Sequence, residues 1–167
     1  MTKISNYPCG LDLQPPAQEG CSGSTLPPEM LLPITTKDNT APHNHSPLNL
    51  AYIGDAVYSL LVRTRLVTQA NRPTHALNKA ATAKVKATDQ STNYYKLQPH
   101  LKEEELSVLK RGRNASPATK AKSASLADYR NATGLEALFG YLYLNGQNAR
   151  ILELFDICWS DSNEERP

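Results

Sequence analysis

Two acidic residues stand alone in long, largely apolar stretches of the sequence. Asp55 is the only formally charged residue between positions 46 and 62, and Glu136 is the only one between positions 131 and 149. An unpaired carboxylate is costly to bury, so each acid is kept either by a structural hydrogen bond or for chemistry. Spacing alone leaves these two explanations evenly balanced. Four tyrosines are available as structural donors: Tyr52, Tyr58, Tyr141 and Tyr143.

Glycines accompany both acids. Gly54 directly precedes Asp55, while Gly134 and Gly140 lie on either side of Glu136. Glycine inside a helix costs about 1 kcal/mol relative to alanine, so its use in apolar helices indicates that backbones approach closely there. If the two helices cross at these glycines, we expect the two carboxylates to meet.

Two neighbouring carboxylates away from water repel each other unless one is protonated or a cation lies between them. Mg²⁺ is commonly held by one or two carboxylates, with waters and substrate phosphate completing its shell. Such an ion can activate a water and neutralise charge on a phosphodiester. Asp55 and Glu136 are therefore candidate metal ligands and catalytic residues.

The charge of the chain is unevenly distributed. Residues 63–122 contain thirteen lysines and arginines against four acids, although the net charge of the whole chain is only +2. A surface biased in this way is typical of proteins that bind polyanions. Together with the paired acids, it favours metal-dependent phosphodiester chemistry over a purely structural role for Asp55 and Glu136.

The elements that must position these residues are helical, because no segment alternates with period two. The apolar spacing predicts helices over 46–66, 74–95, 102–112, 126–144 and 149–159, with Gly112 ending the third and Asn145-Gly146 the fourth. Leu50, Ile53, Val57, Leu60 and Leu61 form the apolar face of the first helix. The fold is predicted to be all-α, with a domain over 46–160, a disordered N-terminal extension over 1–45 and a flexible C-terminus over 161–167.

Several classes of protein are disfavoured by composition. The three cysteines are odd in number and widely spaced, which argues against a disulfide framework or a zinc ribbon. No apolar run reaches the ~18 residues of a membrane span, so we expect no membrane association. We expect a cytoplasmic protein, a plastid location being the weaker alternative. His75 and His100 have no adjacent acid, which disfavours a small-nucleotide phosphohydrolase.

Three separated motifs resemble one family in their order: "LAYIGDAVY" (50–58), "KRGRNA" (110–115) and "YRNATGLEALFGYLYL" (129–144). They are similar to the Mini-III ribonucleases, which keep the helical endonuclease domain of ribonuclease III and lack its double-stranded-RNA-binding domain. The resemblance implies a homodimeric endonuclease, dependent on Mg²⁺ with Mn²⁺ as a substitute, that cuts double-stranded RNA in ribosomal RNA precursors (23S). It implies 5′-phosphate and 3′-hydroxyl ends, and it assigns metal binding to Asp55 and Glu136.

The sequence departs from the larger ribonuclease III pattern at two positions. Ala51 and Thr133 stand where larger relatives carry a glutamate and an aspartate. This reduction leaves one or two metals per site open. It also leaves an alternative function, a catalytically reduced protein that binds double-stranded RNA or the ribosome.

Without a separate RNA-binding domain, we expect the substrate to be gripped by the catalytic domain itself. Duplex RNA is recognised mainly through its shape, phosphates and 2′-hydroxyls, which suits basic side chains. A ribosomal protein or pre-ribosomal particle is a further partner compatible with this reading. The candidate RNA-binding residues are Lys79, Lys84, Lys86, Lys110, Arg111, Arg113, Asn114, Lys120, Lys122 and Arg130.

Overall fold

The computed structural model describes residues 44–115 and 125–160. In these ranges the chain forms six α-helices and one short 3₁₀-helix, with no strand, so the predicted all-α class is confirmed. The elements are α1 (Pro47–Gln69), α2 (Thr74–Lys84), α3 (Ala87–Leu97), η3 (Gln98–His100), α4 (Glu103–Asn114), α5 (Leu126–Leu144) and α6 (Asn148–Ser160).

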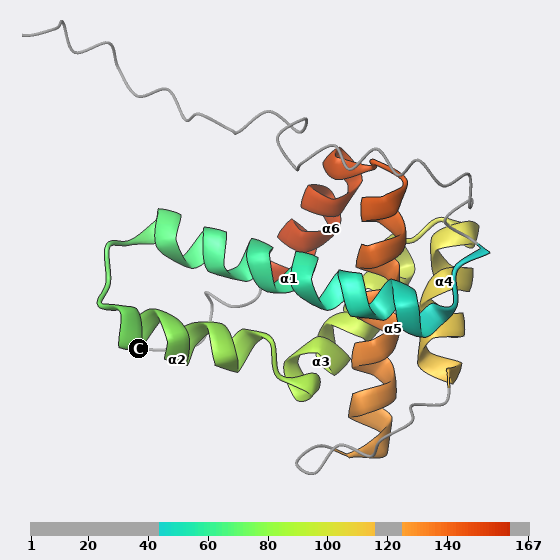
Figure 1. Ribbon diagram of the computed structural model, residues 1–167, viewed down its shortest axis with the longest axis horizontal. Coiled ribbons are helices and arrows are strands. Elements are labelled where there is room, and N and C mark those ends of the chain that lie inside the picture. Colours follow the sequence, from blue (N-terminus) through green and yellow to red (C-terminus); the bar gives the residue numbers. More distant parts are fainter. Residues whose placement is uncertain (1–43, 116–124, 161–167) are drawn as a thin grey trace, which may run out of the picture.

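Helix α5 forms the centre of the fold, and α1, α3, α4 and α6 surround it (Figure 1). Between positions 131 and 142 every residue of α5 is buried except Glu136. A helix that is apolar all round belongs in a core, as the sequence of α5 predicts. Tyr58 of α1 meets Phe139 of α5 and Phe155 of α6 edge to face, with ring centroids 5.2 and 5.8 Å apart. The core thus joins α1, α5 and α6 through aromatic contacts.

Helices α1 and α5 cross with their backbones in contact, as their glycines predict (Figure 1). A Cβ atom at Gly54 would overlap the carbonyl oxygen of Glu136 and lie 2.8 Å from the amide nitrogen of Gly140. A Cβ atom at Gly140 would overlap the carbonyl oxygen of Leu50. Any larger residue at either glycine would push the two helices apart.

A second glycine crossing joins α4 to α5, and here the prediction from sequence was wrong. Gly112 does not end its helix, because α4 continues to Asn114. A Cβ atom on Gly112 would lie 2.6 Å from the Cβ of Ala137, and one on Gly134 would lie 2.7 Å from the carbonyl oxygen of Leu109. Gly134 therefore serves the contact with α4 rather than the contact with α1.

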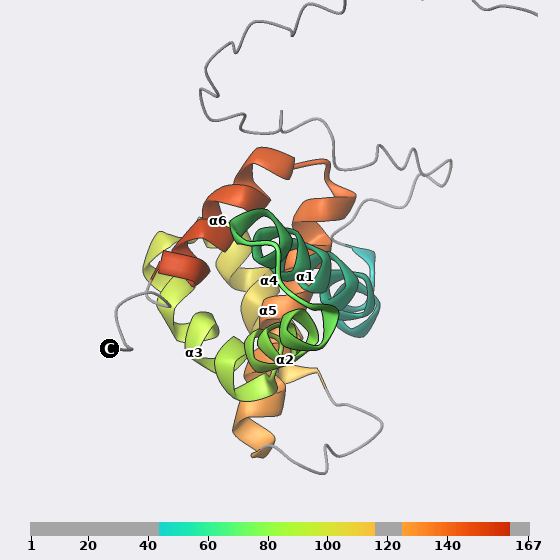
Figure 2. The same ribbon diagram turned by 90° about the vertical axis from the view of Figure 1, so that its left-hand side faces the viewer.

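The single helix predicted over 74–95 is also wrong, because the chain turns between α2 and α3 (Figure 2). Val85 leaves helical geometry with φ −95° and ψ 3°, and Lys86 is extended with φ −63° and ψ 145°. The turn lets α2 contact α1 while α3 contacts α5. Periodicity continues across the break, so it could not reveal a change in helix direction.

The ends of the helices follow local chemistry. Ser46 caps α1 by accepting a hydrogen bond from the amide of Asn49 at 3.1 Å, and Pro47 occupies the first helical position. Gly146 follows α5 with φ +66°, a conformation that favours glycine. One residue of the predicted apolar face lies outside the core: Leu60 is 53% exposed.

Some sequence predictions fall outside the described residues. They concern positions 1–43 of the N-terminal extension, Lys120 and Lys122, and the segment 161–167. Within the described ranges, none of the helices combines the length and hydropathy that a membrane span requires.

Candidate active site between α1 and α5

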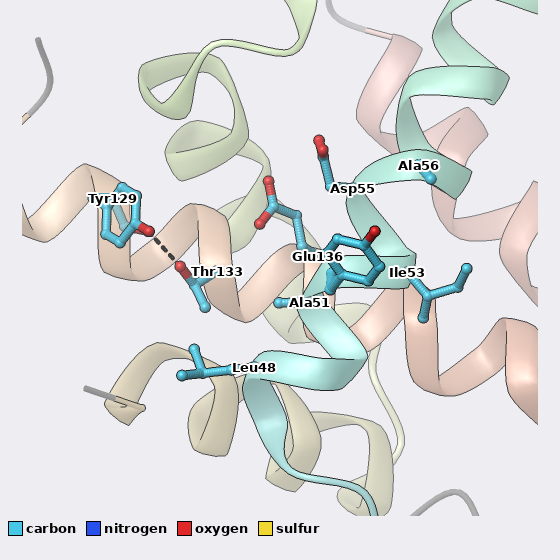
Figure 3. Close-up of a pocket in the computed structure, with 9 residues that line it drawn as sticks. Leu48, Ala51, Ile53, Asp55, Ala56, Tyr129, Thr133 and Glu136 are labelled. Carbon is cyan, nitrogen blue, oxygen red and sulfur yellow. Dashed lines mark hydrogen bonds between the residues drawn. The ribbon is translucent and has the colours of Figure 1, made fainter. Parts of the chain in front are cut away.

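An open cleft of about 760 Å³ lies where α1 crosses α5. The carboxylates of Asp55 and Glu136 point toward the same space there, one from each helix (Figure 3). The glycine crossing explains this juxtaposition, because Asp55 follows Gly54, whose backbone touches that of Glu136. The cleft is lined by Leu48, Ala51, Tyr52, Ile53, Asp55, Ala56, Tyr129, Thr133 and Glu136.

The two acids differ in exposure, which corrects the premise that both are buried. Asp55 is exposed at the surface of the chain, whereas Glu136 is partly buried. Successive residues of an α-helix point about 100° apart, so Asp55 faces outward when Gly54 is pressed against α5. The cost of desolvation therefore falls on Glu136.

The environment of Glu136 opposes its ionisation. Burial, and after it the charge of Asp55, raise the pKa of Glu136 to about 8, while the side-chain amide of Gln90 acts in the opposite direction. Among the described residues neither acid makes an ion pair. The two acids thus lie together with no compensating cation among the described residues, and Glu136 can lose its proton readily only when a cation joins them.

The tyrosines do not supply the structural hydrogen bonds that the sequence left open. Tyr58 accepts a hydrogen bond from Asn93 Nδ2 at 3.0 Å, Tyr141 donates to Glu104 Oε1 at 2.5 Å, and Tyr52 is 85% exposed. Neither acid has a hydrogen bond from any of the four tyrosines. The structural explanation for the pair therefore receives no support from the tyrosines.

The positions that carry further acids in larger relatives are occupied by side chains that cannot contribute a carboxylate. Ala51 is buried in the wall of the cleft, and the Thr133 hydroxyl donates to the backbone carbonyl of Tyr129 at 3.0 Å (Figure 3). No group of three or more His, Cys, Asp or Glu side chains that could hold a metal occurs in the described ranges. Two oxygen donors beside open space fit Mg²⁺, which keeps several waters, and do not fit a closed tetrahedral zinc site.

Comparison with known proteins agrees with this geometry. The model of the Ribonuclease III domain family matches residues 48–147. The Mini-ribonuclease 3 of Brevibacillus brevis is 48% identical over 113 residues, which cover 68% of this chain and 84% of that protein. The Mini-ribonuclease 3 of a Thermoanaerobacter species is 45% identical over 112 residues, covering 67% and 79%.

This chain belongs to the Mini-ribonuclease 3 family. It is accordingly an endoribonuclease of the ribonuclease III type, as the three motifs indicate. A crystal structure of a Fusobacterium nucleatum protein is similar to it with a TM-score of 0.65 and 34% identity, over 70% of this chain and 93% of that one. Family membership favours catalysis over the alternative of a non-catalytic binding protein.

The predicted RNA-binding residues on α4 lie beside the first half of α5. Lys110, Arg111 and Asn114 are exposed at the end of α4, and Arg130 is exposed on α5. Arg113 is half-buried and ties the two helices together. Its Nε donates to Asn131 Oδ1 at 3.0 Å, and its Nη1 donates to Asn114 Oδ1 at 3.3 Å. The structure thus gives Arg113 a structural role in addition to its predicted one.

The three predicted lysines between positions 79 and 86 also differ in their exposure. Lys79 and Lys86 are exposed, whereas Lys84 is half-buried. The ammonium of Lys84 lies 3.8 Å from Asp89 and 5.7 Å from the ring centroid of Trp159 on α6. Lys84 is therefore held by contacts within its own chain.

Sequence reasoning missed the contribution of α3 to the site. The helix buries three polar side chains, those of Gln90, Ser91 and Asn93, at 1%, 5% and 6% exposure. Gln90 acts on the Glu136 carboxylate. A signal existed in the segment "ATDQSTNYYKL", which has few apolar residues and yet must pack against the core.

Proposed function

We propose that this endoribonuclease cleaves double-stranded RNA with Mg²⁺ held between Asp55 and Glu136. One observation supports the proposal above all others. Two carboxylates from crossing helices point into one open cleft, the pKa of one of them is raised to about 8, and no cation of the described residues pairs with either. A hard divalent cation is the partner that relieves their repulsion.

The chemistry at this site is hydrolysis of a phosphodiester. Mg²⁺, or Mn²⁺ in its place, would supply an activated water and neutralise charge on the phosphate. Asp55 and Glu136 hold the ion, and the open cleft leaves room for the RNA backbone to reach them. The water oxygen bonds to phosphorus and the bond to the 3′ oxygen breaks, which leaves a 5′-phosphate and a 3′-hydroxyl. Because Ala51 and Thr133 add no carboxylate, we expect one ion per site.

A homodimer would present two such sites to the two strands of a duplex. The exposed surface of α1, which includes Asp55, also carries large apolar residues along its length: Leu48, Tyr52, Leu60 and Val67 are 39%, 85%, 53% and 59% exposed. Apolar side chains in such numbers on one helix are costly to leave in water and are typical of an interaction surface. An isologous pairing along this face matches the approximate two-fold symmetry of duplex RNA.

The proposed substrate is a structured precursor of ribosomal RNA, with 23S as the specific case that the family resemblance suggests. Lys110, Arg111, Asn114 and Arg130 would contact the backbone of the duplex, and Lys79 and Lys86 would extend this surface. Mapping the ends produced from precursor rRNA, with and without Mg²⁺, tests the substrate and the end chemistry together.

The direct test of the mechanism is the Asp55→Asn variant of the full chain. Loss of a ligand that contributes several kcal/mol to charge stabilisation is expected to slow duplex cleavage by about 10³-fold or more. Dimerisation and duplex binding are expected to persist. Asp156→Asn, which removes an exposed acid on α6, is the matched control and should cut normally. Undiminished cutting by Asp55→Asn would remove the mechanism.

A further inference from the structure

The Nε2 group of the buried Gln90 side chain has no hydrogen-bond partner among the described residues. Gln90 is 1% exposed, and its Nε2 atom is shielded from solvent and unpaired. An amide buried without a hydrogen bond costs roughly 1–3 kcal/mol, so its retention in the core calls for an explanation.

Its neighbours on α3 show what buried polar groups do here. Ser91 Oγ accepts a hydrogen bond from Asn131 Nδ2 on α5 at 3.0 Å, and Asn93 Nδ2 donates to the hydroxyl of Tyr58 on α1 at 3.0 Å. Each of these side chains links α3 to one of the two helices that form the cleft. Gln90 lies one turn before Asn93 and on the same face, so it faces the same junction.

The acid on which the Gln90 side chain acts is Glu136. The amide draws the pKa of Glu136 down, against the effects of burial and of Asp55. Packing fixes this approach, because the ring of Tyr94 lies against Gly134, where an added Cβ would be 3.0 Å from the ring. Helix α3 is therefore held against α5 two residues before Glu136.

We propose that Gln90 is a positioning residue for Glu136: its side-chain amide donates to the carboxylate and orients it toward the ion shared with Asp55. The inference rests on the proposed function. A ligating carboxylate uses one oxygen for the metal and needs a donor for the other, and loss of such an outer partner typically costs 10–100-fold in metal affinity or activity. Gln90 does not touch RNA or the ion, so it acts through Glu136 alone.

The test measures binding of Mn²⁺ alone to the RNA-free protein, using the EPR signal of the free ion. Gln90→Met keeps the length of the side chain and removes the donor, so we expect affinity to fall 10–100-fold. Ser91→Ala removes a neighbouring buried hydrogen bond of α3 and should change affinity less than about threefold. In a chelator, unfolding of Gln90→Met should occur at the wild-type temperature or above, because an unpaired buried amide has been removed. A merely structural role would lower that temperature and leave Mn²⁺ affinity unchanged, which would overturn the inference.

Two further outcomes separate this inference from the proposed function. If wild-type protein binds no Mn²⁺, both fail together. If wild-type protein binds it, Asp55→Asn does not, and folded Gln90→Met binds as wild type, only the inference on Gln90 fails. A measurement on the unaltered chain guards against a variant that does not fold: the ¹⁵N resonance of the Gln90 side-chain amide should shift on addition of Mg²⁺, and an unmoved resonance would contradict the proposal.

Discussion

Two glutamates of this protein meet their surroundings in opposite ways. Glu105 on α4 is 3% exposed, and Arg150 donates to both of its oxygens at 2.9 Å, with the Lys102 amide as a third donor at 2.9 Å. Burial pushes the pKa of Glu105 up, but these hydrogen bonds hold it below its ordinary value. Glu136 is less buried, yet its pKa is raised to about 8 because burial and Asp55 both oppose its charge.

This fold can neutralise a buried acid with its own groups. At Glu105 it does so completely, and the result is a structural link between α4 and α6. At Glu136 the nearby charged group is a second acid, Asp55. The repulsion between the two carboxylates is therefore left to be relieved by a partner from outside the chain. Perturbed carboxylates of the second kind cluster at functional sites.

The largest loss of stability is expected when Glu105 loses the arginine that pairs with it. Arg150→Met leaves Glu105 buried and unpaired, which should lower the free energy of unfolding by about 3–5 kcal/mol. Urea denaturation at neutral pH measures the loss. Asp156→Asn breaks the exposed ion pair with Arg65 and should cost less than about 1 kcal/mol. Equal losses in the two variants would mean that Glu105 and Arg150 do not form the tight link described here.

The next effect concerns the crossing that brings the two acids together. Gly54→Ala inserts a methyl group against the Glu136 carbonyl and should destabilise the protein by about 1–3 kcal/mol. Gly112→Ala makes the same insertion at the crossing of α4 with α5 and is the matched control. Both variants should lose stability in thermal unfolding, but only Gly54→Ala should also lose cleavage rate per folded molecule. Equal cleavage rates per folded molecule in the two variants would show that the crossing of α1 with α5 does not determine catalysis.

A smaller effect distinguishes Glu136 from Glu105 by the way each makes stability depend on pH. In a chelator, folded protein keeps a proton on Glu136 that the unfolded chain releases above about pH 4.5, so stability should fall as pH rises toward 8 and then level. Glu136→Gln should remove this slope and gain on the order of 1–3 kcal/mol at pH 8. The pKa of Glu105 is lowered, so its contribution has the opposite sign and is lost as pH falls.

Denaturation curves of wild type and Glu136→Gln across this range, subtracted from each other, isolate the contribution of Glu136. A difference that does not change with pH would show that Glu136 is an ordinary surface acid.

The sequence predicted those features of the site that follow from the residue types within a single helix. The lone acids, Gly54 and Gly140 gave the crossing and the meeting of Asp55 with Glu136, because backbone contact requires glycine. Sequence did not give the exposure of Asp55, which follows from the rotation of α1 against α5.

The spacing of apolar residues could not predict which helices distant in the chain contact each other. The break at Val85 and Lys86 keeps the helical period on both sides, and Gly112 resembles a helix stop although it serves a crossing. Gln90 was missed because the polar composition of its segment does not say which of the polar residues is buried until α5 is in place.

We propose that Asp55 and Glu136 share one cation. Its most direct test is a double-mutant cycle on Mn²⁺ binding to the RNA-free protein, comparing wild type, Asp55→Asn, Glu136→Gln and the double variant. If one ion is shared, each single substitution abolishes most of the binding, and the double variant is little worse than either one. Wild-type affinity in either single variant, or losses that simply add, would contradict a shared ion.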